Sequence, residues 1–191
     1  MISRIDHISI AVKDYEKALS FFRDILGAVS GTSAEDHGRK YRWEIFSFGD
    51  LSRLELLCPT GKGSFLDNFF KKRKRGGLHH ITLQTPDINK AKKTLKDNSI
   101  PYFGYNEYGD FWKEIFIHPE DAFGVLIQIA EFTPDDWLDK SATFPKGQKW
   151  SVKKSENGCT LTFAHPGGGK VDLKLTKTDI KKLISDLEQS C

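Results

Sequence analysis

The chain has 191 residues, of which 38% are hydrophobic, 12% aromatic and 29% charged, and its formal net charge is +3. This composition is typical of a soluble globular protein and excludes a disordered or fibrous chain. No apolar run approaches the roughly 20 residues needed to span a bilayer. The basic residues are interspersed with acidic ones, so neither a membrane nor a nucleic acid is expected as a partner.

The expected location is the cytoplasm. The N-terminal stretch MISRIDHISIAV has neither the long apolar region nor the small-residue cleavage site of a signal peptide. The three cysteines are widely spaced and odd in number. This pattern favours free thiols in a reducing compartment over a disulfide framework.

The first predicted elements are a strand over residues 5–12 and a helix that begins near Asp14. Asp14 is a natural N-cap, because its side chain can accept a hydrogen bond from the first helical turn. Gly27 lies where the helix is expected to end. The helix has an apolar stripe at three- and four-residue spacing, formed by Tyr15, Ala18, Leu19, Phe22 and Leu26.

The same strand, turn and helix recur later in the chain. The stretch DHISIAVKDYEKALSFF matches HHITLQTPDINKAKKTL, which places His7 over His80 (80 − 7 = 73) and Asp14 over Asp87. The match predicts a second strand over residues 79–85 and a second helix that begins near Asp87. An internal repeat of this kind indicates a duplicated structural unit.

Each copy ends in a predicted strand–turn–strand hairpin. WEIFSFGDLSRLELLCP resembles KEIFIHPEDAFGVLIQIAEF, with Glu44 over Glu114. Glu55 then falls on Gln128 if the second turn carries three extra residues (128 − 114 = 14 against 55 − 44 = 11). The order in each copy is therefore βαβββ, which predicts an α+β fold whose two tandem modules form a concave mixed sheet.

The remainder of the chain predicts a separate small unit. Three short strands are expected over residues 149–154, 159–164 and 170–175, followed by a helix over residues 177–189. We therefore expect a two-module domain over residues 1–132 and a C-terminal β-rich appendage with a terminal helix over residues 133–191. The two modules are predicted to span about 1–72 and 77–132.

Polar residues at equivalent places of the two copies predict a metal site. His7 and His80 lie in the first strand of each copy, whereas Glu55 and Gln128 lie in the last. Each alone would more often be an ordinary strand residue. Alternate side chains of a strand share a face, so a pseudo-twofold repeat brings the four together in the concave sheet. Two imidazoles and one carboxylate suit zinc, manganese, cobalt, nickel or ferrous iron.

Four segments carry a resemblance to a known family: HISIAVKDYEKALSFFRDILG, RLELLCP, GLHHITL and HPEDAFGVLIQIAE. They resemble the vicinal-oxygen-chelate superfamily of glyoxalases, bleomycin-resistance proteins and dioxygenases, over about residues 5–132. The resemblance is strongest to the methylmalonyl-CoA epimerase family. It implies a divalent metal as the only cofactor, and Glu44 as a general base beside that metal. It implies four ligands, namely His7, Glu55, His80 and Gln128.

The function implied by the resemblance is that of a metal-dependent isomerase. Such an epimerase removes the α-proton of an acyl substrate and stabilises the resulting enolate. The expected substrate is a small molecule such as a CoA thioester, and a homodimer is among the expected assemblies. The family usually has Glu where this chain has Gln128, and an amide where it has Glu55. The four ligands are thus of the same chemical types as in the family, but the carboxylate and the amide are exchanged between the two copies.

Three alternative functions use the same sheet. A glyoxalase-I-like lyase is weakened by Gln128, because a neutral amide cannot act as a base. A ferrous dioxygenase is the second alternative, since two histidines and a carboxylate can form a facial triad. A module that binds a small molecule without catalysis, and without metal, is the third.

Overall fold

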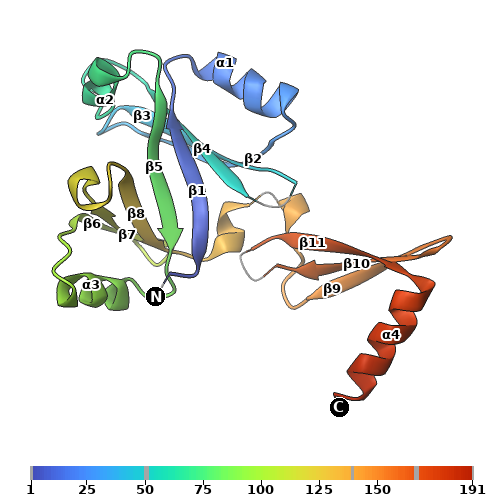
Figure 1. The fold of residues 1–191 in the computed structure, drawn as a ribbon. Coiled ribbons are helices and arrows are strands. Elements are labelled where there is room, and N and C mark those ends of the chain that lie inside the picture. Colours follow the sequence, from blue (N-terminus) through green and yellow to red (C-terminus); the bar gives the residue numbers. More distant parts are fainter. Residues whose placement is uncertain (1, 50–51, 139, 166–167, 191) are drawn as a thin grey trace. The chain divides into compact units, whose positions relative to one another are not determined.

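The computed structural model divides into two compact units, Met1–Trp137 and Leu138–Cys191. The first unit holds an eight-stranded sheet with its helices, and the second holds a three-stranded sheet and one long helix (Figure 1). The domain boundary after residue 132 stays a prediction. The structure describes residues 2–49, 52–138, 140–165 and 168–190.

The first unit contains the predicted βαβββ order twice. The first copy comprises β1 (Arg4–Ala11), α1 (Tyr15–Leu19) with its π-helical continuation η1 (Ser20–Ile25), β2 (Val29–Asp36), β3 (Tyr41–Ser47) and β4 (Arg53–Pro59). The second copy, reached through helix α2 (Asp67–Lys72), comprises β5 (Gly77–Gln84), α3 (Ile88–Asp97), β6 (Phe103–Tyr108), β7 (Trp112–Ile117), the 3-10 turn η2 (Pro119–Asp121) and β8 (Leu126–Glu131). A further 3-10 turn, η3 (Pro134–Trp137), ends the unit.

The strand order β2-β3-β4-β1-β5-β8-β7-β6 makes the two copies symmetrical about the centre of the sheet. β1 and β5 pair antiparallel at this centre, and each pairs in parallel with the last strand of its own copy. The resulting mixed sheet is curled (Figure 1). The first and last strand of each copy, which carry the predicted ligands, therefore lie side by side in the middle of this sheet.

The predicted helix ends are confirmed in both copies. The Asp14 side chain accepts a hydrogen bond from the backbone of Lys17 at 3.0 Å, and Asp87 accepts one from the backbone of Lys90 at 2.9 Å. Gly27, with a φ of 74°, follows η1 in the left-handed conformation that glycine adopts most easily. The π-helical turn was not expected from the apolar spacing.

Helices α1 and α3 cover one face of the sheet, whereas α2 packs through Phe70 against Ala11 and Leu57 at the edge of the other face, which carries the site. Phe46, Leu54 and Leu56 pack against Ala18, Leu19 and Phe22 of α1 and η1. In the second copy the helix α3 packs in the same way, through Ile88, Ala91 and Leu95, against Ile115, Ile117 and Ile129. Since side chains alternate along a strand, His7, Glu55, His80 and Gln128 all point to the opposite, inner face.

The register of the two hairpins corrects the alignment made from sequence. Ile45 lies opposite Glu55, and Phe116 lies opposite Gln128. The second turn is therefore longer by two residues (128 − 116 = 12 against 55 − 45 = 10), not by three. A slip of one residue moves a side chain to the other face of a strand. Glu44 and Glu114 consequently face opposite sides of the sheet.

The second unit is the predicted β-rich appendage with a terminal helix. It begins with the short turn η4 (Lys140–Ala142) and continues with β9 (Trp150–Ser155), β10 (Gly158–Ala164), β11 (Lys170–Thr176) and α4 (Lys177–Glu188). The strands form an antiparallel sheet of order β11-β10-β9. Thr176 and Asp179 form a capping box that starts α4. Among the described residues of both units, no helix is long and apolar enough to cross a membrane.

Candidate active site

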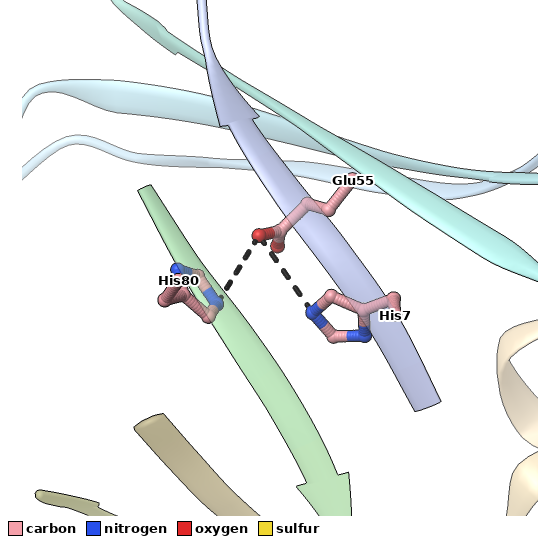
Figure 2. A group of neighbouring side chains, drawn as sticks. All are labelled: His7, Glu55 and His80. Carbon is pink, nitrogen blue, oxygen red and sulfur yellow. Dashed lines mark ion pairs between the residues drawn. The ribbon is translucent and has the colours of Figure 1, made fainter. Parts of the chain in front are cut away.

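Three of the predicted ligands converge on the inner face of the central strands. Glu55 Oε2 lies 3.8 Å from His7 Nε2 and 3.6 Å from His80 Nε2. Figure 2 shows the two imidazoles approaching the carboxylate from β1 and β5. One ligand atom from each residue lies within 4.8 Å of the others, and all three residues are buried. A carboxylate and two imidazoles thus share one small volume.

Two hydroxyl groups link the predicted ligands in pairs. Ser9 donates to Glu55 Oε2 and lies 2.9 Å from His80 Nε2. Thr82, at the equivalent place in the second copy (82 − 9 = 73), donates to Gln128 Oε1 at 2.5 Å and lies 2.8 Å from His7 Nε2. Each hydroxyl therefore joins the last-strand ligand of its own copy to the histidine of the other. Gln128 joins the cluster through Thr82.

The donor set fits a divalent metal ion. Ligand atoms bound at about 2.0–2.2 Å from one ion lie roughly 3–3.5 Å from one another. The separations between Glu55 Oε2 and the two imidazole nitrogens are only slightly larger. Two neutral imidazoles, one carboxylate and one amide oxygen suit borderline ions such as zinc, cobalt, nickel, manganese or ferrous iron.

The orientation of His7 is fixed by a buried carboxylate. Asp6 Oδ2 lies 2.7 Å from His7 Nδ1, and Asp6 also accepts hydrogen bonds from Arg4 and Arg53. Burial opposes ionisation of Asp6, but the hydrogen bond from His7 and the charges of Arg53 and Arg4 together hold its pKa below the usual value. An ionised Asp6 keeps the proton of a neutral His7 on Nδ1, so the lone pair of Nε2 faces the site.

The variant Asp6→Asn is expected to weaken metal binding by about 10–100-fold, because partners behind a ligating histidine typically contribute that much. An asparagine keeps the shape of Asp6 but loses the charge that holds the His7 proton. Competition between the protein and a chelator for cobalt measures the dissociation constant. An unchanged dissociation constant in a folded Asp6→Asn protein would contradict the role given to Asp6.

His79 plays the corresponding part behind His80. Its Nδ1 lies 2.9 Å from His80 Nδ1, while its ring contacts Phe65 and Phe69. Burial lowers the pKa of His79 to about 4, so at neutral pH it is a neutral acceptor. Burial, followed by the neighbouring His7 and His79, also lowers the pKa of His80 well below its usual value. A neutral His80 that donates from Nδ1 to His79 directs the lone pair of Nε2 towards Glu55.

The electrostatics of Glu55 favour a cation at this place. Burial is the largest influence and raises the pKa of Glu55, while the nearby His7 and the hydrogen bond from Ser9 lower it only in part. A buried carboxylate that ionises with difficulty on its own is stabilised by a positive charge next to it. Metal binding is therefore expected to weaken as the pH falls and Glu55 becomes protonated.

A cavity of about 480 Å³ opens onto this cluster. Its polar wall includes His7, Glu55 and Gln128, and its aromatic wall includes Trp43 and Trp112. Small-molecule sites typically combine such an apolar surround with a few converging polar groups. The cavity is large enough for a small molecule to reach the cluster.

Glu44 lies outside this cavity. Its neighbours Trp43 and Ile45 line the cavity, whereas Glu44 points to the outer face, where its carboxylate accepts a hydrogen bond from Tyr15 of α1. Burial, and then the hydrogen bond to Glu44, raise the pKa of Tyr15 to about 12, so the phenol remains a donor. The structure thus gives Glu44 a position between sheet and helix, and its catalytic role stays a prediction.

The variant Tyr15→Phe is expected to lower the free energy of unfolding by about 1–3 kcal/mol, because it removes a donor from a buried carboxylate. Urea unfolding of the two proteins measures this difference. The affinity for cobalt is expected to stay unchanged, since Tyr15 lies on the outer face. A stability equal to that of the parent protein would contradict a structural role for the Tyr15–Glu44 pair.

Comparison with known proteins agrees with this geometry. The model of the glyoxalase/bleomycin resistance protein/dioxygenase superfamily matches residues 6–116. The chain belongs to this superfamily. An ethylmalonyl-CoA/methylmalonyl-CoA epimerase of Cereibacter sphaeroides is 36% identical over 136 residues, which cover 69% of this chain and 99% of the relative. The human mitochondrial methylmalonyl-CoA epimerase is 35% identical over 134 residues, which cover 68% of this chain and 74% of the relative.

Solved structures of superfamily members share the fold. A Streptomyces coelicolor methylmalonyl-CoA epimerase variant in complex with 2-nitronate-propionyl-CoA superposes with a TM-score of 0.61 and 26% identity, covering 70% of this chain and 99% of the other. The methylmalonyl-CoA epimerase of Mycobacterium tuberculosis has a TM-score of 0.63 and covers 70% of this chain and 90% of the other. At 24% identity the second likeness shows the fold alone.

Several residues of the site were missed by the sequence analysis. Ser9 and Thr82 share the 73-residue offset of the two histidines (82 − 9 = 73), and this offset was the signal that could have found them. Asp6 directly precedes the first histidine, but its contact with Arg53 depends on the pairing of β1 with β4. His79 directly precedes the second histidine, and its contact with His80 Nδ1 could not be foreseen from this adjacency alone.

Proposed function

We propose that this protein is a divalent-metal-dependent epimerase that acts on a 2-alkylmalonyl thioester of coenzyme A, such as methylmalonyl-CoA. The observation that carries the proposal is the convergence of His7, Glu55 and His80 beside the cavity, which His7 and Glu55 line. The similarity to methylmalonyl-CoA epimerases over two thirds of the chain supports the reaction. The cytoplasmic location and the homodimer stay predictions.

We propose that His7, Glu55, His80 and the amide oxygen of Gln128 hold the ion. A bound divalent ion supplies Lewis-acid stabilisation of the negative charge that develops on the acyl oxygens when the α-proton leaves. The buried side chains keep water away from this charge, which strengthens every electrostatic interaction in the site. The aromatic wall of the cavity surrounds the acyl group.

For the proton transfer, we propose Asp36 of β2 in place of the Glu44 predicted from sequence. Asp36 lies opposite Tyr41 in the strand register, and both residues line the cavity. The backbone of Arg39 donates a hydrogen bond to Asp36 Oδ1 at 2.8 Å, which leaves the second oxygen of the carboxylate for the proton. A base needs a lone pair within reach of the substrate. Asp36 meets this requirement, whereas Glu44 would have to act from the outer face.

The proposed function is tested by incubating the metal-loaded protein with methylmalonyl-CoA in deuterated water. We expect deuterium at the α-carbon and interconversion of the two epimers, and neither in the metal-free protein. Absence of exchange with all five candidate metals would overturn the proposal. Turnover of a glutathione hemithioacetal, or oxygen consumption by the iron form, would point instead to the lyase or the dioxygenase.

A further inference from the structure

Glu114 is a buried carboxylate beside the proposed ligand Gln128. It lies on β7, lines the cavity and is only 5% exposed. Its Oε2 accepts hydrogen bonds from Gln128 Nε2 at 2.6 Å and from Trp112 Nε1 at 2.8 Å, and its Oε1 accepts one from Asn106 Nδ2 at 2.8 Å. The carboxylate is thus held from three sides.

The contact with Glu114 decides which end of the Gln128 amide faces the site. An amide has one accepting and one donating end, and an ionised carboxylate can only accept. Nε2 of Gln128 must therefore face Glu114. The oxygen is left to face Thr82, 2.5 Å away, whose hydroxyl lies 2.8 Å from His7 Nε2. Only the oxygen end of an amide is a metal ligand of the kind the site needs.

The first copy does not need such a partner. In the second copy, Glu114 lies two residues before Phe116, which is opposite the ligand Gln128. In the first copy, Ile45 is opposite the ligand Glu55, so the equivalent position, two residues earlier, is Trp43. The ligand of the first copy is Glu55, whose two oxygens both accept, so neither orientation is wrong. The carboxylate of Glu114 accordingly occurs in the second copy, where the amide of the ligand Gln128 could otherwise point either its oxygen or its nitrogen towards the site.

We infer that Glu114 is a positioning residue, which locks the amide of Gln128 with its oxygen towards the metal site. This inference rests on the proposed function, because it takes Gln128 as a ligand. The hydrogen bond to a charged acceptor also polarises the amide and makes its oxygen a better donor to a cation. Glu114 thereby supplies negative charge behind the one neutral oxygen ligand.

The test is the variant Glu114→Gln, which keeps the shape but removes the charge and the obligatory acceptor. We expect the dissociation constant for cobalt to rise about 10–100-fold, as for other partners behind metal ligands. The visible absorption of the bound cobalt is expected to change, because one of its oxygen ligands is no longer fixed. Glu107→Gln is the matched control, since Glu107 lies on the neighbouring strand, is exposed, and does not line the cavity.

The double variant Glu114→Gln with Gln128→Glu separates positioning from simple structural support. It exchanges the two groups, so that the amide at position 114 donates to a carboxylate at position 128. We expect the affinity for cobalt to return to within a few-fold of the parent value. A merely structural role of Glu114 predicts instead that Glu114→Gln lowers the affinity of the Gln128→Glu protein as much as it lowers that of the parent.

Each result has a distinct meaning. Parent-like affinity and spectrum in Glu114→Gln would overturn the inference, and so would a double variant that binds no better than the single one. If Glu114→Gln does not fold, the double variant alone decides, through its affinity and spectrum. Absence of cobalt binding by the parent protein would instead overturn the proposed function.

Discussion

Replacement of both His7 and His80 by alanine is expected to remove divalent-metal binding and, with it, catalysis. The two Nε2 atoms are the nitrogen ligands of the proposed site, and Glu55 with Gln128 would leave only two oxygen ligands. Loss of affinity should exceed the roughly 10–100-fold effect typical of residues behind the ligands. Elemental analysis after dialysis measures the bound metal in the parent and in the double variant.

His118→Ala is the control for this experiment. His118 lies in the turn between β7 and β8, its side chain is 53% exposed, and it pairs with Glu120. Its removal deletes a histidine without touching the site, so metal content should stay at the parent level. Equal metal content in the double variant and the parent would mean that the ion binds elsewhere and that the central cluster is not its site.

Replacement of Asp36 by asparagine is expected to slow α-proton exchange by about 10²–10⁴-fold, the usual contribution of a positioned base. Metal affinity should be unchanged, because Asp36 lies on β2, away from the cluster of His7, Glu55 and His80. Mass spectrometry of methylmalonyl-CoA incubated in deuterated water measures the rate. Cobalt titration of the same protein separates loss of the base from loss of the metal.

The matched variant is Glu44→Gln, which neutralises a carboxylate on the next strand but on the outer face. Its exchange rate is expected to stay much closer to that of the parent. The opposite result, with exchange lost in Glu44→Gln and retained in Asp36→Asn, would establish the base predicted from sequence and refute the assignment made from the cavity. Both variants should be compared at equal metal loading.

The sequence predicted the architecture because the repeat encodes it locally. The matching strands and helix caps of the two copies each depend on residues near one another in the chain, as with Asp14 and Asp87. The 73-residue offset then placed His7 over His80 and Glu55 over Gln128 (80 − 7 = 128 − 55 = 73). The structure brings these side chains to one face of adjacent strands.

The sequence alignment put Glu44 on the wrong face of the sheet because side chains along a strand alternate between the two faces. The alignment of Glu44 with Glu114 was displaced by one position, and such a displacement inverts the face. The register of each hairpin depends on the number of residues in its turn, and the sequence alone did not show that number. The contacts of Glu114 with Asn106 and Gln128 were missed because they depend on the same hairpin registers. The contact of Asp6 with Arg53 was missed because it depends on the parallel pairing of β1 with β4.

The most direct test of the central claim is a cobalt titration of metal-free protein in deuterated water with methylmalonyl-CoA present. Our account predicts that the rate of deuterium incorporation at the α-carbon rises with added cobalt and levels off at about one equivalent per chain, as expected for a single site of three protein ligands or more. A rate that is already maximal without metal, or that stays at zero at every cobalt concentration, would contradict it.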